Sequence, residues 1–279
     1  MRILVPTDFS DYAKDALIYA VELNKSLGGG SITLLNVFPH TSISPYVYDE
    51  LIKSITSEIK SKTVNKLKDE WNKNGAKRIS KSDNLKVEFK AEEGAIVDCI
   101  LGTAKKNRSE LILMGTKGGG KIKRFLFGTN ASKVIERSDC PVITVPKLAK
   151  YKKISRILFT TDCNRHEMDS IIDTIKMAKV YGAHLDIVYI TDEDTDTAMK
   201  ALQRIKKLVE EKSDYKKISY EPIISDDVTD AIEVYIQVKK VSLLALATKK
   251  RTLFNKIFDK NLAKELAFHL KVPLLAYHR

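Results

Sequence analysis

Residues 2–8 read Arg-Ile-Leu-Val-Pro-Thr-Asp, and residues 156–162 read Arg-Ile-Leu-Phe-Thr-Thr-Asp. In both stretches a short apolar run ends in a polar turn, which is the pattern of a buried strand followed by a loop. A second matched pair closes the two halves of the chain, as Cys140-Pro-Val-Ile-Thr-Val145 and Val272-Pro-Leu-Leu-Ala-Tyr277. The chain is therefore expected to use one architecture twice.

The two copies define two expected domains, residues 1–148 and 152–279, joined by a basic linker. In each of them, runs of strand length alternate with segments whose apolar residues recur at spacings of three and four, which predicts parallel βαβ units. The expected fold class is α/β, with two tandem doubly wound, five-stranded parallel sheets, each a three-layer sandwich of flavodoxin-like type. The expected strands lie near residues 3–6, 32–37, 85–91, 111–114 and 141–145, and near 156–160, 184–190, 218–224, 241–246 and 273–277.

The composition excludes several classes of protein. The 279 residues are 43% hydrophobic and 30% charged, with a formal net charge of +12, so the chain is neither disordered nor collagen-like. The most apolar run, Val241 to Ala247, is far shorter than the ~18 residues of a membrane span. The N-terminus turns polar too soon for a signal peptide, so we expect a cytoplasmic protein without a membrane partner. Its three cysteines are expected to be reduced thiols.

The densest signal for a ligand site is the segment Gly115-Thr-Lys-Gly118-Gly-Gly-Lys-Ile-Lys-Arg-Phe-Leu-Phe-Gly128-Thr129-Asn130. It follows the apolar run 111–114, and ligands of doubly wound sheets bind at the carboxyl ends of strands. Glycines let backbone amides converge on phosphate oxygens, and Lys117 with the other basic residues adds positive charge. Thr129 and Asn130 precede a helical stretch, where they can cap the helix and donate to an anion. The segment therefore predicts a phosphate-binding loop.

Two common phosphate loops do not match this segment. Gly115-x4-Gly120-Lys121 begins like a P-loop, but Ile122 stands where a P-loop has its magnesium-binding Ser or Thr. A Rossmann fingerprint would place its glycines in the first strand–helix turn, and the turn at 6–10 has none. Both motifs are excluded.

The spacing Gly115-x2-Gly118-x9-Gly128-Thr129 resembles the G-2x-G-9x-G-(S/T) signature of the ATP-binding branch of the universal stress protein family. The resemblance covers the whole chain as a tandem of two such domains, with a fold similar to that of the adenine nucleotide alpha hydrolases. Further matches are Pro6-Thr7-Asp8 at the end of the first strand, Val37 at the end of the second, Met114-Gly115 at the end of the fourth and Cys140-Pro141-Val142 before the last.

The resemblance implies an ATP site in the first domain, with or without Mg²⁺. Asp8, next to Pro6, would accept hydrogen bonds from the adenosine moiety, and backbone groups of Val37 would face adenine. Met114 and Gly115 would lie by the ribose and the first phosphates. The groups around the outer phosphates would be Gly118, Gly128, Thr129 and Asn130, with Lys117 nearby. Ala131 replaces a second hydroxyl that the family often carries, so the need for Mg²⁺ stays open.

The same family pattern is only partly present in the second domain. Asp162 matches Asp8, but Thr160 replaces the proline, and residues 247–256 contain no glycine. Aligning Pro273 with Pro141 places Lys260 opposite Gly128. Side chains at these positions would block close backbone approach to phosphates. We therefore expect the second domain to be structural or regulatory.

Three functions stay open on the sequence. The first is a nucleotide-binding stress-response protein that acts as a sensor or signalling module. The second is a slow ATPase or nucleotidyl-transfer enzyme on the same fold, although no Ser-His-Asp or Cys-His arrangement assigns a catalytic residue and no metal-ligand set is assigned. The third is a nucleic-acid-binding protein, which the charge alone suggests. Residues 1–150 hold 25 Lys and Arg against 17 Asp and Glu, so a bound phosphate chain would account for part of that charge.

The resemblance also implies how the two domains associate. They would form an intramolecular pseudo-dimer through their last strands, 141–145 and 273–277. Apolar strands of this kind would otherwise leave exposed sheet edges. A homodimer of whole chains is a further expectation.

Overall fold

The computed structural model describes residues 1–40, 49–80, 83–116, 129–147, 149, 151–248 and 272–278 of the chain. Strands alternate with helices throughout, and each expected strand is found within a few residues of its predicted position. We call β1 to β5 the N-terminal half and β6 to β10 the C-terminal half. The N-terminal half contains β1 (Arg2–Pro6), α1 (Asp11–Ser26), β2 (Gly30–Phe38), α2 (Asp49–Asn74), the 3-10 turn η1 (Ala76–Arg78), β3 (Leu85–Glu93), α3 (Ile96–Lys106), β4 (Leu111–Gly115), α4 (Thr129–Arg137) and β5 (Val142–Val145).

The C-terminal half follows the same alternation. Helix α5 (Met168–Tyr181) is followed by Gly182, which adopts the left-handed conformation (φ 63°) that a side chain would disfavour. Side chains fix two helix starts: Asp194 accepts from the backbone N–H of Thr197, and Asp227 accepts from that of Thr229. The elements are β6 (Arg156–Thr161), η2 (Arg165–Glu167), α5 (Met168–Tyr181), β7 (His184–Thr191), α6 (Thr195–Lys212), β8 (Ile218–Ile224), α7 (Val228–Lys239), β9 (Leu243–Thr248) and β10 (Leu274–His278).

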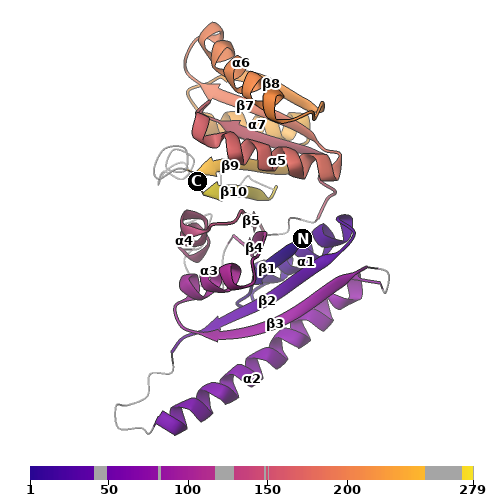
Figure 1. The fold of residues 1–279 in the computed structure, drawn as a ribbon, viewed down its shortest axis with the longest axis vertical. Coiled ribbons are helices and arrows are strands. Elements are labelled where there is room, and N and C mark those ends of the chain that lie inside the picture. The colour runs from indigo at the N-terminus through magenta and orange to yellow at the C-terminus, as the bar shows by residue number, and fades with distance from the viewer. Residues whose placement is uncertain are drawn as a thin grey trace.

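The strands form one ten-stranded sheet with the order β3-β2-β1-β4-β5-β10-β9-β6-β7-β8 (Figure 1). Within each half all pairings are parallel, and both halves repeat the order third, second, first, fourth, fifth. Strand order reverses beside β1 in one half and beside β6 in the other, which is where doubly wound sheets bind ligands. The predicted α/β fold class is confirmed. The domain boundary near residues 148–152 falls between β5 and β6 and stays a prediction.

Helices cover both faces of the sheet and give three layers. One hydrophobic cluster packs α1, α2, α5 and α6 on one face, and a second packs α3, α4 and α7 on the other. The apolar strand β4 contributes Leu111 and Leu113 to the first cluster and Ile112 and Met114 to the second. A strand buried on both faces reads as a continuous apolar run, which is why the sequence pattern located β4.

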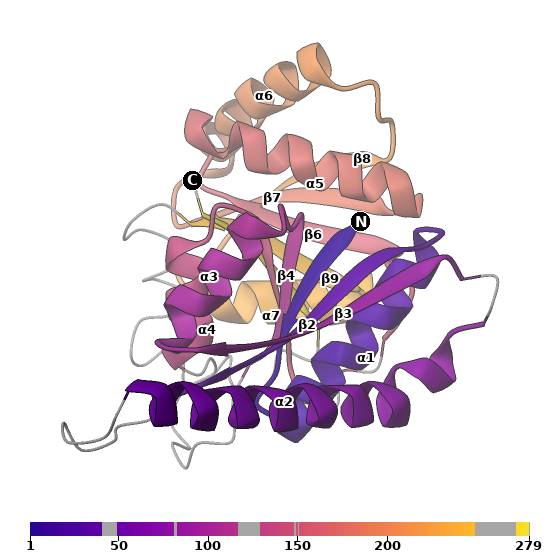
Figure 2. The same ribbon diagram turned by 60° about the horizontal axis from the view of Figure 1, so that its bottom comes forward.

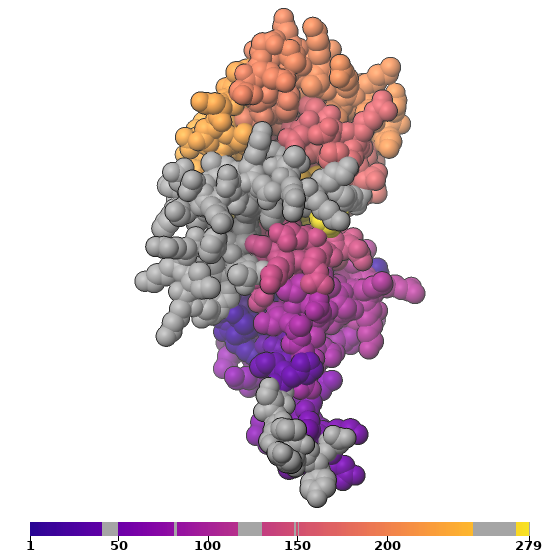
Figure 3. Space-filling model, turned by 90° about the vertical axis from the view of Figure 1, so that its left-hand side faces the viewer, coloured from indigo at the N-terminus to yellow at the C-terminus, as the bar shows by residue number. Residues whose placement is uncertain are grey.

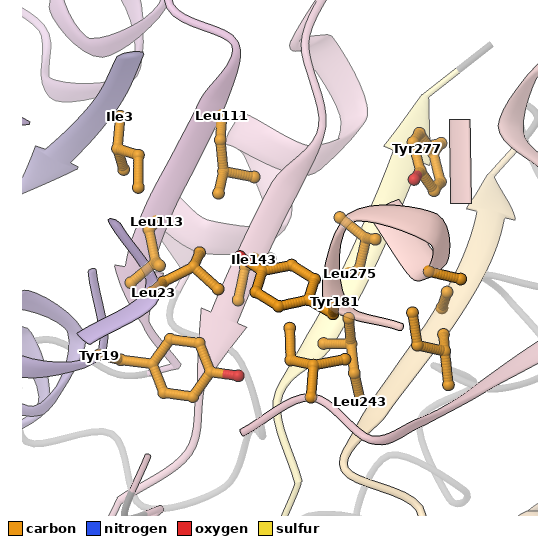
Figure 4. Close-up of a cluster of buried hydrophobic side chains, with 14 of the residues drawn as sticks. Ile3, Tyr19, Leu23, Leu111, Leu113, Ile143, Tyr181, Leu243, Leu275 and Tyr277 are labelled. Atoms are coloured by element: carbon orange, nitrogen blue, oxygen red, sulfur yellow. The ribbon is translucent and has the colours of Figure 1, made fainter. Parts of the chain in front are cut away.

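The two halves meet where β5 pairs antiparallel with β10, with Ile143 opposite Leu275. Buried side chains from both halves form one cluster across this pairing, including Ile143, Leu243 and Leu275 (Figure 4). The rings of Tyr19 and Tyr151 lie edge to face with centroids 5.1 Å apart, and the Tyr151 hydroxyl donates to Ser26 Oγ at 3.0 Å. The hydrophobic core is therefore continuous between the halves.

The longest helix, α2, has 26 residues, whereas its counterpart α6 has 18. Leu67 and Trp71 anchor its second part in the core. Because the sheet twists, α2 also passes close to the start of α1, as Figure 2 shows. This crossing brings a side chain of α2 to the end of β1.

Candidate functional site

The turn after β1 is built by its own polar side chains. Thr7 is buried, and its Oγ1 accepts from the backbone N–H of Phe9 at 3.0 Å. Asp8 Oδ1 accepts from the backbone N–H of Ser10 at 3.1 Å, and Ser10 in turn caps α1 through the backbone N–H of Ala13. Phe9 takes a left-handed conformation (φ 63°), which is uncommon for a residue with a side chain. The exposed Asp8 carboxylate is therefore held in a fixed direction at the carboxyl edge of the sheet.

The structure brings the first part of the predicted site together at this edge. Pro6 ends β1, Val37 lies next to the end of β2, and Met114 and Gly115 end β4, on the other side of β1. Asn36 Nδ2 donates to the Thr7 carbonyl oxygen at 2.7 Å, and so ties β2 to the turn that carries Asp8. Figure 3 shows the side of the molecule toward which β2 and β3 run in Figure 1, where indigo atoms of the first residues reach the surface.

Gly115 is required by the packing of β4 against α1. A Cβ atom at this position would lie 2.6 Å from the Tyr12 carbonyl oxygen, a distance that real Cβ atoms do not adopt. In the C-terminal half, Ala247 takes the matching place at the end of β9 and is buried. The turn after β1 therefore packs more tightly against the adjacent strand than its counterpart does.

The second part of the predicted site is only partly described. Helix α4 begins at Thr129 and has Asn130 in its first turn, so both residues lie within the helix and not ahead of it as expected. Lys117, Gly118 and Gly128 lie outside the described residues.

Two lysines at this edge were not predicted from the sequence. The Lys66 ammonium lies 5.1 Å from the centroid of the Phe9 ring, and the Lys147 ammonium lies 5.6 Å from that of Tyr12. Lys66 comes from α2 and Lys147 from just beyond β5. No local pattern could indicate them, because only the fold brings these segments to the turn.

The turn after β6 has the same backbone geometry as the turn after β1. Cys163, which aligns with Phe9, has φ 58°, and its backbone N–H donates to Thr161 Oγ1 at 2.9 Å. The chemistry differs because Glu167 enters this turn with 1% of its surface exposed. Its Oε2 accepts from Thr161 Oγ1 at 2.5 Å and from the backbone N–H of Asp162 at 3.1 Å.

Burial is the main cause that raises the pKa of Glu167 to about 7, against an ordinary value of 4.5. The negative charge of Asp162 raises it further, while the hydrogen bond from Thr161 opposes the shift. The second carboxyl edge thus holds a buried glutamate, Glu167, at the position where the first edge has Ala13.

The difference continues along the helices that follow. Ala16 and Ala20 of α1 align with Ser170 and Thr174 of α5, and all four are buried. Thr174 Oγ1 donates to the Tyr277 hydroxyl at 3.1 Å. The helix after β6 therefore carries two small polar side chains on its otherwise largely apolar buried side, which the apolar spacing of α5 did not indicate.

The cysteines offer no reactive thiol. All three are free, and burial raises the pKa of the Cys99, Cys140 and Cys163 thiols above the ordinary value. A raised pKa keeps a thiol protonated and weakly nucleophilic. Within the described residues, no His, Cys, Asp and Glu cluster could hold a metal ion, and no helix has the length and apolar character to cross a bilayer.

Fold and edge geometry together define a class: a doubly wound α/β protein, a fold in which ligands bind at the carboxyl ends of the strands. A family model described as the universal stress protein family matches residues 1–146, and the chain therefore belongs to this family.

Individual relatives agree with this assignment. Universal stress protein MJ0531 of Methanocaldococcus jannaschii is 29% identical over 154 residues, which cover 53% of this chain and 84% of that protein. Universal stress protein MJ0577 of the same organism is 30% identical over 157 residues, covering 52% and 94%. The crystal structure of a universal stress protein from Archaeoglobus fulgidus superposes with a TM-score of 0.73 at 17% identity, covering 100% of this chain and 98% of that one. The last match shows that the fold is shared over the full length.

Proposed function

We propose that this chain binds an adenine nucleotide, ATP, at the carboxyl edge of its N-terminal half and acts as a nucleotide-responsive sensor or signalling module. One observation carries the proposal: the two carboxyl edges share a turn but differ in chemistry. The first combines Asp8 with the glycine segment that begins at Gly115, whereas the second keeps Asp162, buries Glu167 beside it and has Ala247 in place of Gly115.

The residues of the first edge suit the parts of such a ligand. The fixed Asp8 carboxylate would accept hydrogen bonds from the adenosine moiety, and the backbone of Val37 would face adenine. Met114 and Gly115 would lie by the ribose, where the missing Cβ also lets β4 approach α1. Lys117, Gly118, Gly128, Thr129 and Asn130 would surround the phosphates. Glycine amides and a helix start are the donors that phosphate oxygens prefer.

The C-terminal half would then serve as a structural or regulatory partner. The antiparallel pairing of β5 with β10 and the shared core support a pseudo-dimer in which a change at the first edge reaches the second half. Signalling would follow from altered association of this unit, in a homodimer or with another protein.

Mass spectrometry of small molecules released from the protein, purified without added ligand, tests the proposal. We expect an adenine nucleotide at one per chain. A Gly118→Asp variant should lose it, because a carboxylate within the loop repels phosphate. Lys250→Asp is the matched control, because position 250 aligns with 118 in the C-terminal half.

The outcomes are separable. Absence of nucleotide from the wild type, together with no thermal shift on adding ATP, would overturn the proposed function. Two nucleotides per chain at saturation would contradict the role given to the C-terminal half. A hydrolysis rate that Gly118→Asp abolishes without unfolding would favour a slow ATPase over a sensor.

A further inference from the structure

Two positively charged groups flank the turn after β1 from opposite sides. Lys66 reaches Phe9 from α2, and Lys147 reaches Tyr12 from the segment after β5. Both lysines are exposed. Among the described residues, neither has a carboxylate within ion-pair distance, so both ammonium groups rest on aromatic rings instead. An exposed cation–ring contact is weak, which leaves the ammonium able to turn toward an anion.

The rings place these ammonium groups at the predicted site. Phe9 follows Asp8 directly, and the backbone of Tyr12 is the group that a Cβ at Gly115 would strike. Lys66 therefore lies beside the residue expected to hold adenosine, and Lys147 lies beside the start of the glycine segment. The crossing of α2 over the start of α1 is visible in Figure 2.

The turn itself carries negative charge, which these two lysines can offset. Asp8 and Asp11 place two carboxylates at the same edge, and both are exposed. Such groups repel a triphosphate unless nearby positive charge offsets them. A nucleoside without phosphates would not meet this repulsion.

The turn after β6 differs from the turn after β1 in its side chains. Cys163 and His166 align with Phe9 and Tyr12, so the phenyl and phenol rings are replaced, and Arg165 aligns with Asp11. The turn holds Glu167 in its interior and Asp162 beside it. A buried carboxyl group therefore stands in the second turn where the first turn has Ala13.

We propose that Lys66 and Lys147 set the preference of the first site for nucleotides with a phosphate chain. The inference rests on the proposed function and adds to it two residues outside the glycine signature.

Calorimetric titration of the full chain with ATP and with adenosine tests this inference. Lys66→Ala and Lys147→Ala should each weaken ATP binding about threefold, and the double variant about tenfold, with less dependence on salt. Adenosine affinity should change by less than about twofold in all three. Lys68→Ala is the matched control: this exposed lysine lies two positions from Lys66, on the other side of α2, and should leave ATP affinity unchanged.

Three results would overturn the inference. The first is unchanged ATP affinity in the double variant, and the second is an equal loss for ATP and adenosine. The third is a loss of the same size in Lys68→Ala, which would indicate a general surface field. If the wild type binds neither ligand, the proposed function fails and this inference with it, whereas normal binding by the double variant refutes the two lysines alone.

Discussion

Replacing Glu167 by glutamine should make the protein more stable above pH 7 and slightly less stable near pH 4.5. The carboxyl group is buried at the end of β6, and its pKa is raised to about 7 from an ordinary 4.5. Between these two values the folded protein keeps the proton that the unfolded chain has already released. The stability that the protonated Glu167 carboxyl group contributes is therefore complete below about pH 4.5 and is lost as the pH rises through 7.

The magnitude follows from the same two values. Their difference corresponds to about 3 kcal/mol of unfolding free energy that the wild type loses at pH 8. Glutamine has nearly the same shape, carries no charge at any of these pH values, and keeps an oxygen that can accept from Thr161 and from the backbone N–H of Asp162. Its amide N–H groups find a poorer environment, so we expect a net gain of about 2 kcal/mol at pH 8.

Urea denaturation between pH 5 and pH 8.5 measures this effect. The wild type should lose stability across this range, and the Glu167→Gln variant should lose much less. Two controls separate other causes: Glu136→Gln removes an exposed carboxylate, and His166→Gln removes the exposed histidine that precedes Glu167. Parallel pH profiles for wild type and Glu167→Gln would refute the reasoning, and so would a flattened profile in His166→Gln alone.

Further predictions concern packing and buried charge. Gly115→Ala should destabilise the protein by about 1–3 kcal/mol in thermal denaturation, because its Cβ would lie 2.6 Å from a carbonyl oxygen of α1. The reverse change, Ala247→Gly, should cost only about 1 kcal/mol, and equal losses would contradict the tighter packing at β4. Arg156→Ala should cost about 3 kcal/mol in urea denaturation, because its guanidinium donates to both oxygens of the fully buried Asp186 at 2.8 and 2.9 Å. Arg2→Ala, at the aligned position where the ion pair is exposed, should cost less than about 1 kcal/mol.

Most of the fold could be predicted from the sequence because apolar periodicity reports burial. The continuous run of β4 and the spaced alanines of α1 each have one structural explanation, a strand covered on both faces and a helix covered on one. Strand β3 lies at the edge of the sheet, and its residues 85–91 alternate between apolar and charged side chains, as a strand covered on one face does. These signals come from residues that are close together in the sequence, and such signals are enough to predict whether a segment forms a strand or a helix.

The candidate site could be predicted only where its residues are neighbours in the sequence. The turn at Asp8 and the glycines from Gly115 onward form local motifs, whereas Lys66 joins them through a helix crossing that no motif encodes. Glu167 could not be predicted as a buried residue for a different reason. A glutamate after a polar turn indicates solvent exposure, and its burial depends on how α5 packs against β6.

The pairing of β5 with β10 has a consequence for how the two halves stay assembled. Two separate chains that met through such strands would come apart on dilution. Here both strands belong to one polypeptide, so the contact has the high effective concentration of a tethered pair and persists at any abundance in the cell. A change in expression level would then alter how many such units exist, but not the state in which each of them is assembled.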